Sequence, residues 1–187
     1  ALGTTGRGIG TTYADKFNRI GIRVIDFLEE DIFMEKLKIA LELKNYLFRE
    51  YYKEQMLAVD KIYEETKIYR DRIKKMVKNI AFYLNEEMEK GKSILAEGAQ
   101  GTFLDIDFGT YPYVTASNCI AGGACTGLGI SPKKVKRIIG VVKSYTTRVG
   151  MGPFPTELKG VEGEMLRKIG NEYGATTGRP RRCGWFD

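Results

Sequence analysis

Three arginines and two threonines gather in one polar run near the C-terminus, at residues 172–182. Two glycines lie among them, and the run holds no large aliphatic side chain that could join a core. Arginine guanidinium groups bind carboxylates and phosphates through paired hydrogen bonds. Glycine lets the backbone come close to a ligand. The composition of this run therefore predicts an anion-binding loop.

Four polar, glycine-flanked loops of the chain share this character. They are residues 3–10, 98–102, 111–118 and 174–182. Their threonine hydroxyl groups and backbone N–H groups can hold a phosphate without a helix, and two of the loops also supply arginine. Glycine with threonine is common in ordinary turns as well, so each loop alone has two interpretations. Their joint occurrence favours phosphate binding.

Gln100 offers a different chemistry from the other loop residues. Its primary amide can donate to one carbonyl oxygen and accept from an adjacent N–H, which suits the edge of a purine. The alternative is that Gln100 bonds the backbone of its own loop. Asp105 and Asp107 alternate along an extended run and so point the same way; we expect them to cap a turn or face solvent rather than bind a metal.

The sequence does not indicate a histidine-based, zinc, disulfide or dinucleotide-binding site. The chain has no histidine, which removes histidine acid–base catalysis and histidine metal ligation. Its three cysteines lack C-x-x-C spacing, so neither zinc nor a disulfide framework is indicated, and a reducing cytoplasm fits best. Residues 3–10 match neither a dinucleotide fingerprint nor a G-x-x-x-x-G-K-[ST] phosphate loop.

The elements that must position these loops alternate along the second half of the chain. Residues 93–97 are predicted to form a short buried strand that ends at Gln100's loop, and ligands in α/β sheets bind at such strand ends. Residues 138–147 are predicted to form a β-branched strand. Residues 163–170 are predicted to form a helix that leads into the arginine-rich run. This alternation indicates an α/β fold.

The middle of the chain is predicted to be helical. Apolar residues recur with a helical period at Phe33, Leu37 and Leu41. A second pattern covers residues 59–80 and includes Tyr69 as an inward-facing position. The chain therefore divides into a connection at 1–30, a helical part at 31–92 and a strand-and-loop part at 93–187. The helical part is a largely helical insertion in the α/β fold.

The net charge of +6 allows a second interpretation, a basic nucleic-acid-binding module. Lysines interleaved with glutamates along the helical part instead predict a solvated face, so we expect no nucleic-acid partner. A third interpretation is a helical structural or interaction domain centred on residues 31–90, with silent loops. The chain holds no apolar run long enough to span a membrane, so no membrane partner is expected.

Five motifs together resemble the adenylosuccinate synthetase family, and the last of them is highly specific. They lie at residues 3–10, 97–102, 109–115, 147–150 and 174–182. The resemblance extends along the whole chain but covers only the middle of that enzyme. It implies a central fragment of a single-domain α/β enzyme, with part of a central sheet like that of P-loop NTPases.

The resemblance implies a GTP-dependent ligase of purine biosynthesis. The family joins IMP to L-aspartate with GTP and Mg²⁺, and it releases adenylosuccinate, GDP and phosphate. In the implied first step the 6-oxygen of IMP takes the γ-phosphoryl group of GTP. The amino group of aspartate then displaces that phosphate.

The same resemblance implies a role for individual residues. Those implied to contact IMP are Thr5, Arg19, Gln100, Thr115, Val149 and Arg179. Those implied to surround aspartate, in a loop that closes over it, are Ala175, Thr176, Thr177, Gly178 and Arg179. Gln100 would also stabilise charge on the 6-oxygen, and Arg181 would lean toward a GTP phosphate. Arg19 resembles the arginine that reaches IMP in the other subunit, which implies a homodimer.

Several parts of the family's active site have no counterpart in the motifs of this chain. The phosphate loop, the aspartate that acts as base and the histidine that acts as acid belong to the family's N-terminal segment. The Mg²⁺ ligands belong to the same segment, and guanine-specificity residues belong to the C-terminal one. Since phosphoryl transfer depends on positioning and charge neutralisation, we expect the 187-residue chain alone to lack synthetase activity.

Overall fold

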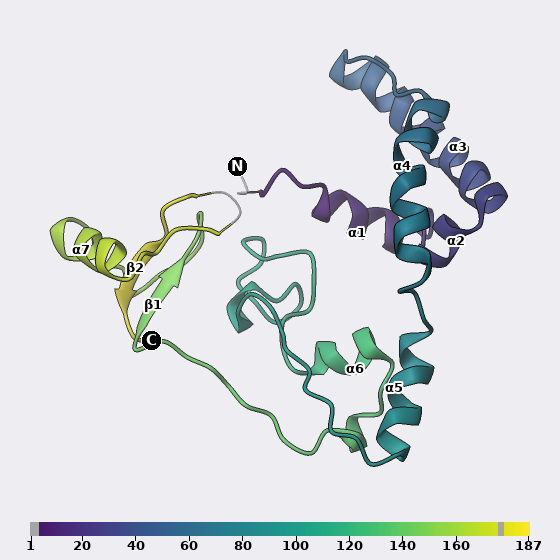
Figure 1. Ribbon diagram of the computed structural model, residues 1–187. Helices are drawn as coiled ribbons and strands as arrows, with labels where there is room; N and C mark the ends of the chain where they lie inside the picture. Colours follow the sequence, from purple (N-terminus) through teal and green to yellow (C-terminus); the bar gives the residue numbers. More distant parts are fainter. Residues whose placement is uncertain (1–3, 176–177) are drawn as a thin grey trace. The chain divides into compact units, whose positions relative to one another are not determined.

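The computed structural model describes residues 4–175 and 178–187, which form two compact units (Figure 1). The helical unit comprises residues 11–83, and the loop unit comprises residues 84–187 with the first ten residues. The helical elements up to the unit boundary are α1 (Ile9–Phe17), α2 (Val24–Leu28), α3 (Glu30–Tyr46), a π-helical turn (Leu47–Tyr52), α4 (Val59–Lys74) and α5 (Ile80–Glu89). The helical part predicted from the apolar periodicity therefore exists.

The core of the helical unit lies along one face of α3. Phe33, Leu37 and Leu41 are buried there, as their helical spacing predicts. The partly buried residues that pack against them come from α2, α4 and the preceding connection: Ile22, Phe27, Val59, Ile62 and Tyr63. Burying three large apolar side chains contributes about 1.5–3 kcal/mol each, and this holds α2, α3 and α4 together.

Arg70 of α4 takes a buried position that the apolar pattern assigned to Tyr69. The side chain of Tyr69 is 60% exposed, whereas Arg70 is 2% exposed. The Arg70 guanidinium lies 4.8 Å from the centre of the Tyr63 ring, and its Nη2 donates to Glu30 Oε1 at 3.2 Å. Arginine can pack its stem against apolar groups and its planar head on aromatic rings, so an apolar pattern overlooks it.

The loop unit contains few regular elements. They are the last part of α5, a 3₁₀ turn (Thr102–Leu104), α6 (Gly122–Leu128), a second 3₁₀ turn (Pro132–Lys134), β1 (Tyr145–Arg148), α7 (Val161–Ile169) and β2 (Arg182–Trp185). β1 and β2 pair in antiparallel orientation, with Thr147 opposite Cys183. Cys183 is fully buried, and α7 packs against β2. The predicted helix at 163–170 is therefore confirmed, and it lies beside this small sheet.

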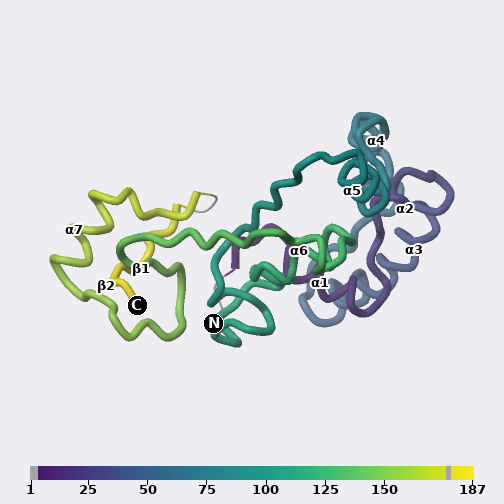
Figure 2. The backbone as a smooth tube through the Cα atoms, turned by 90° about the horizontal axis from the view of Figure 1, so that it is seen from below, coloured from purple at the N-terminus to yellow at the C-terminus, as the bar shows by residue number. Residues whose placement is uncertain are grey.

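Of the two strand predictions, one was wrong and the other was wrong in extent. Residues 93–97 form no strand, and of residues 138–147 only those from Tyr145 onward do. A strand requires a hydrogen-bonded neighbour, and β1 has one in β2, whereas residues 93–97 and 138–144 belong to neither described strand. Residues 136–143 run as extended chain toward β1 (Figure 2), and Val141 is 92% exposed. β-branched composition alone did not make a strand.

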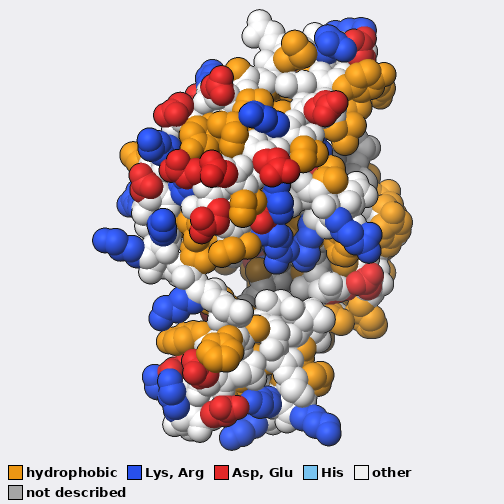
Figure 3. Space-filling view, turned by 90° about the vertical axis from the view of Figure 1, so that its right-hand side faces the viewer, with side chains coloured by type: hydrophobic (Ala, Val, Ile, Leu, Met, Phe, Trp, Pro, Cys, Tyr) orange, Lys and Arg blue, Asp and Glu red, His pale blue; other side chains and the backbone are white. Residues whose placement is uncertain are grey.

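Acidic and basic side chains are interspersed on the surface. On the face shown in Figure 3, red and blue groups alternate with apolar ones and no basic stripe is separated from acidic residues. In the helical unit, Lys36 pairs with Asp26 at 2.6 Å and Lys44 with Asp15 at 2.7 Å. No helix among the described residues is long and apolar enough to cross a membrane.

Candidate functional site

A fully buried carboxylate organises the polar turn after Gln100. Asp105 Oδ1 accepts hydrogen bonds from the backbone N–H groups of Asp107 and Phe108, both at 3.0 Å. Asp105 Oδ2 accepts from those of Cys119 at 2.6 Å and Ile120 at 3.2 Å. The hydrogen bond from Phe108 does most to lower the pKa of Asp105 to about 2, against the effect of burial. Asp105 therefore caps the turn, as the sequence predicted.

This turn brings Gln100 and Thr115 close to residues that neighbour or bond Asp105. The Thr115 N–H donates to Leu104 O at 2.8 Å, and the Cys119 thiol lies 3.7 Å from Gln100 Oε1. Gln100 has a φ of 61°, in the left-handed region, and its side chain is exposed. An exposed amide beside a rigid turn can bind a ligand without first breaking bonds to its own loop. In the structure the Gln100 amide oxygen accepts from the Cys119 thiol, and the ligand-facing role of Gln100 stays a prediction.

Arg148, at the end of β1, joins the polar loop at residues 111–118 to the loop that follows β1. Its Nη2 donates to Thr110 Oγ1 and to Tyr113 O, both at 2.7 Å, and its Nε donates to Met151 O at 3.2 Å. The first two contacts lie in the turn that leads to Thr115. The third lies in the loop that begins with Val149. One guanidinium therefore fixes the distance between these two predicted IMP contacts.

Arg182 holds the same loop from β2. Its Nε donates to Glu157 Oε1 at 2.8 Å in a two-pronged ion pair. Its Nη1 donates to the carbonyl oxygens of Gly150 at 3.1 Å and Gly152 at 2.9 Å. The loop after β1 is thus anchored by two arginines through its backbone, and Val149 remains 40% exposed.

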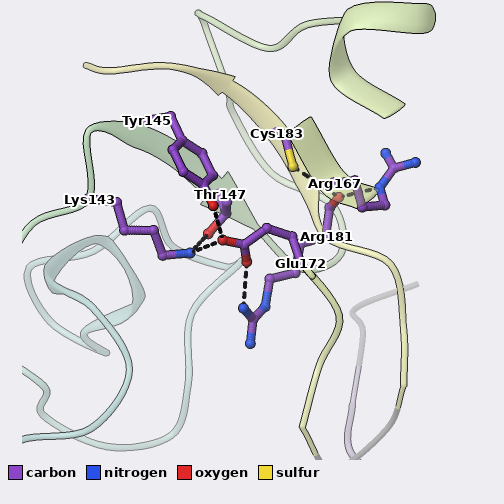
Figure 4. A network of polar contacts seen from close by, with 7 residues as sticks. All are labelled: Lys143, Tyr145, Thr147, Arg167, Glu172, Arg181 and Cys183. Carbon is purple, nitrogen blue, oxygen red and sulfur yellow. Dashed lines mark hydrogen bonds and ion pairs between the residues drawn. The ribbon is translucent and has the colours of Figure 1, made fainter. Parts of the chain in front are cut away.

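A second buried carboxylate lies at the start of the arginine-rich run. Glu172 is 3% exposed, and Figure 4 shows its two oxygens between side chains from β1, from the residues before β1, and from the run itself. Oε1 accepts from Lys143 Nζ at 2.7 Å and from the Tyr145 hydroxyl at 2.6 Å. Oε2 accepts from Arg181 Nη1 at 2.6 Å.

The donors around Glu172 keep its carboxylate ionised. Burial raises the pKa of Glu172, but the hydrogen bonds from Lys143, Tyr145 and Arg181 outweigh it and lower that pKa to about 2. Glu172 in turn raises the pKa of Tyr145 through their hydrogen bond, so the phenol stays protonated and donates. The network holds two cations and one anion and is therefore net positive.

Backbone hydrogen bonds close the base of the arginine-rich loop. The Arg181 N–H donates to Glu172 O at 2.9 Å, and the Gly174 N–H donates to Arg179 O at 2.9 Å. Ala175, Gly178 and Arg179 are exposed within the loop. Thr176 and Thr177, which were predicted to bind aspartate, lie outside the described residues.

The remaining predicted residues lie apart from these loops in the sequence. Thr5 is exposed in the first ten residues of the loop unit. Arg19 belongs to the helical unit, where it follows α1 with a φ of 63° and an exposed side chain. By contrast, the hydrogen-bonded turns described above connect Gln100, Thr115 and Val149.

Sequence reasoning assigned no role to Glu172, Lys143, Tyr145 or Arg148. A signal for two of them was present, because Lys143 and Tyr145 alternate with Thr147 and so lie on one face of an extended segment. Lys143 Nζ indeed donates to Thr147 Oγ1 at 2.7 Å as well as to Glu172. Nothing in the local sequence indicated that a glutamate many residues later would meet that face.

The described residues do not fit a Mg²⁺ site of their own. Among them, no group of three or more cysteine, aspartate or glutamate side chains could hold a metal ion. The carboxylate of Asp105 is occupied by backbone N–H groups, and that of Glu172 by cations.

Comparisons with known proteins agree along the entire chain. A family model described as adenylosuccinate synthetase matches residues 1–187. The chain is 55% identical to an adenylosuccinate synthetase of Streptomyces griseus, covering 100% of this chain and 44% of that relative. It is 54% identical to one of Salinibacter ruber, covering 100% of this chain and 42% of that relative. The chain therefore spans less than half the length of these relatives.

The fold agrees with a solved structure of the same kind. A fully ligated adenylosuccinate synthetase from Plasmodium falciparum matches with a TM-score of 0.90 at 44% identity, covering 99% of this chain and 43% of that one. The predicted α/β class with a largely helical insertion is confirmed, and the described part is helical with a two-stranded sheet. The nucleic-acid module and the purely structural domain are not favoured. The chain belongs to the adenylosuccinate synthetase family.

Proposed function

We propose that this chain is the central part of an enzyme that makes adenylosuccinate from IMP, L-aspartate and GTP. The 6-oxygen of IMP attacks the γ-phosphorus of GTP, and the bond to the β-phosphate oxygen breaks to release GDP. The aspartate nitrogen then attacks carbon 6 of the purine, and phosphate leaves with the former 6-oxygen. The match over residues 1–187 is the observation that carries this proposal.

In this proposal the connected turns of the loop unit bind IMP. Gln100 donates its amide N–H to the 6-oxygen and so stabilises the charge that develops there. Thr115 and Val149, together with Thr5, contact other parts of the nucleotide. The rigid hydrogen bonding around Asp105 supports this role, because a preordered turn does not lose conformational entropy when IMP binds.

The arginine-rich loop binds the two other substrates in this proposal. Arg179 bonds a carboxylate of aspartate and also reaches IMP, and residues 175–178 complete the aspartate site. Arg181 faces a phosphate group of GTP. Guanidinium groups suit both ligands because they donate two parallel hydrogen bonds to carboxylate or phosphate oxygens.

The finer features that the family resemblance implies are part of the same proposal. Mg²⁺ neutralises the phosphates of GTP when it is bound, with ligands from outside the described residues. The enzyme is a cytoplasmic homodimer in which Arg19 reaches the IMP phosphate bound to the other subunit. Exposure of the Arg19 side chain at the surface of the helical unit is compatible with that contact.

The first test replaces Arg179 by alanine in the full-length enzyme. We expect the KM values for aspartate and IMP each to rise about tenfold or more, because each loses a charge-assisted hydrogen bond. Steady-state kinetics with one substrate varied at a time measure these values, with adenylosuccinate followed by its absorbance.

A matched control is Arg72→Ala, which removes an exposed arginine of α4 in the helical unit. We expect this variant to keep the kinetics of the unaltered enzyme. Normal KM values for aspartate and IMP in Arg179→Ala would contradict the assignment of the arginine-rich loop. An unaltered full-length enzyme that makes no adenylosuccinate would contradict the proposed function itself.

A further inference from the structure

The carboxylate of Glu172 contacts β1, the segment before β1 and the arginine-rich loop. It receives Lys143 and Tyr145 on Oε1 and Arg181 on Oε2 (Figure 4). Its own N–H donates to Arg167 O at 2.8 Å, and Arg167 Nε donates to Arg181 O at 2.7 Å. Glu172 and Arg181 are therefore joined through both side chain and backbone.

The two oxygens of Glu172 have different partners: one bonds residues in and before β1, and the other bonds Arg181. Among the described residues, Oε1 accepts from Lys143 and Tyr145, and Oε2 accepts from Arg181. The side chain of Arg181 is 30% exposed, whereas that of Glu172 is 4% exposed. The guanidinium is thus held at Nη1 and retains an exposed part that can meet an anion.

The charge balance of the cluster leaves room for such an anion. Lys143 and Arg181 contribute two positive charges, and Glu172 contributes one negative charge, since its pKa is well below neutrality. An arginine side chain has many rotamers in water, and fixing one costs conformational free energy before any ligand binds. The contact with Glu172 already restricts the Arg181 side chain in the free protein, so less conformational entropy is lost when a ligand binds.

We propose that Glu172 is a positioning residue that orients Arg181 toward the phosphate oxygens of the nucleoside triphosphate. The inference rests on the proposed function, in which Arg181 faces a GTP phosphate. Glu172 itself touches no substrate. It acts by fixing the guanidinium beside the base of the loop, where the Arg181 N–H also bonds Glu172 O at 2.9 Å.

Glu172→Gln in the full-length enzyme tests this role. Glutamine can keep its carbonyl oxygen toward Lys143 and Tyr145, but it then presents an NH₂ group to Arg181 and loses that ion pair. We expect the KM for GTP to rise about tenfold, the equivalent of one lost charge-assisted hydrogen bond. The KM for IMP is expected to stay within about twofold, a difference that uniform unfolding would not produce.

A double-substitution cycle identifies Arg181 as the residue through which Glu172 acts. Arg181→Met alone is expected to raise the KM for GTP by at least as much as Glu172→Gln. In the Arg181→Met background, Glu172→Gln is expected to add less than about twofold, because residues that act as a unit are not additive. Glu172→Asp, which keeps the charge, is expected to restore part of the lost GTP affinity.

Glu87→Gln provides the matched control. Glu87 is also buried, at 7% exposure, and pairs with two lysines, Lys90 and Lys92. It lies in α5, outside the network of Glu172. We expect this variant to keep its KM for GTP, so that loss of a buried ionised carboxylate is not by itself the cause of the effect.

The outcomes separate this inference from the proposed function. An unchanged or lowered KM for GTP in both Glu172→Gln and Glu172→Asp overturns the positioning role, and so do strictly additive effects in the cycle. If Glu172→Gln does not fold, the same comparison is made with Glu172→Asp and Arg181→Met. Normal kinetics in Arg179→Ala would instead overturn the proposed aspartate and IMP site. The effect of Glu172 on the KM for GTP is measured independently of that result.

Discussion

At the scale of single residues, the loop unit depends on buried carboxylates whose partners are all within the chain. Asp105 is bonded by backbone N–H groups, and Glu172 by a lysine, a tyrosine and an arginine. In the sequence, Asp105 lies between two apolar residues and Glu172 lies between two glycines at positions 170 and 174. An acidic residue can serve as a ligand, a solvated group or an internal acceptor, and only the positions of distant donors distinguish these roles.

The lowered pKa of Glu172 predicts a specific pH dependence of stability. The folded-state pKa is about 2 and the ordinary value is 4.5, so folding favours the ionised carboxylate. The stabilisation is complete above about pH 4.5 and is lost as pH falls toward 2. We therefore expect the melting temperature of the full-length enzyme to exceed that of Glu172→Gln at pH 7, and this difference to shrink below pH 4.5.

Thermal unfolding of both proteins between pH 7 and pH 3 measures this difference. Titration of other carboxylates affects both proteins equally and cancels in the comparison. The raised pKa of Tyr145 keeps its phenol protonated throughout this range. A melting-temperature difference that is constant across the range would contradict the assigned ion pairing.

At the scale of elements, Arg148 connects two loops that the sequence treats as separate motifs. Replacing it with methionine keeps the aliphatic stem but removes the hydrogen bonds to Thr110, Tyr113 and Met151. Since the proposed IMP contacts Thr115 and Val149 lie in these loops, we expect Arg148→Met in the full-length enzyme to raise the KM for IMP about tenfold.

The same kinetics should show little change in the KM for GTP in Arg148→Met, which contrasts with the expectation for Glu172→Gln. Arg137→Met, which alters an exposed arginine before β1, serves as control. Equal increases in the KM of all three substrates would indicate general loss of structure rather than separation of the two loops.

The elements also differ in how far the sequence predicts them. The face of α3 with Phe33, Leu37 and Leu41 follows from periodicity, because an amphipathic helix needs only its own spacing to be recognised. Residues 93–97 and most of 138–147 have strand composition but no strand partner among the described residues. Pairing is a property of two segments, so composition in one of them is insufficient. The buried Arg70 was missed because only apolar residues were counted.

The sequence predicted the candidate site residues that belong to recognisable motifs. It did not predict the residues that hold those motifs in place through contacts with distant parts of the chain. Gln100, Thr115 and Arg179 stand out through glycine-rich motifs and the family resemblance. The partners that hold these motifs in place, Arg148 and Glu172, act across long stretches of chain. Their roles depend on the pairing of β1 with β2, which no local pattern specifies.

At the scale of the whole molecule, several large apolar side chains of the loop unit are exposed. Val141 and Val142 are 92% and 76% exposed, and Leu95 is 87% exposed. Clusters of exposed apolar residues generally mark surfaces that another segment or partner covers. The chain also spans only 44% of the Streptomyces griseus relative.

We therefore expect the purified 187-residue chain to form no detectable adenylosuccinate from IMP, GTP, Mg²⁺ and aspartate. The described residues offer no metal-binding cluster, and the chain has no histidine to act as an acid. The measurement is product formation over long incubation, with a full-length enzyme containing this sequence as positive control. Adenylosuccinate formation by the purified chain would contradict the expectation that residues outside this chain are needed for the reaction.

The turn around Asp105 has a consequence for the order in which the chain acquires its structure. Among the described residues, the hydrogen-bond donors to the Asp105 carboxylate lie between 2 and 15 positions away along the chain. Closing so short a loop costs little chain entropy, and such local contacts form quickly. The β1–β2 pairing joins remote segments and must close a longer loop. The turn carrying Thr115 can therefore form early and on its own, before β1 pairs with β2.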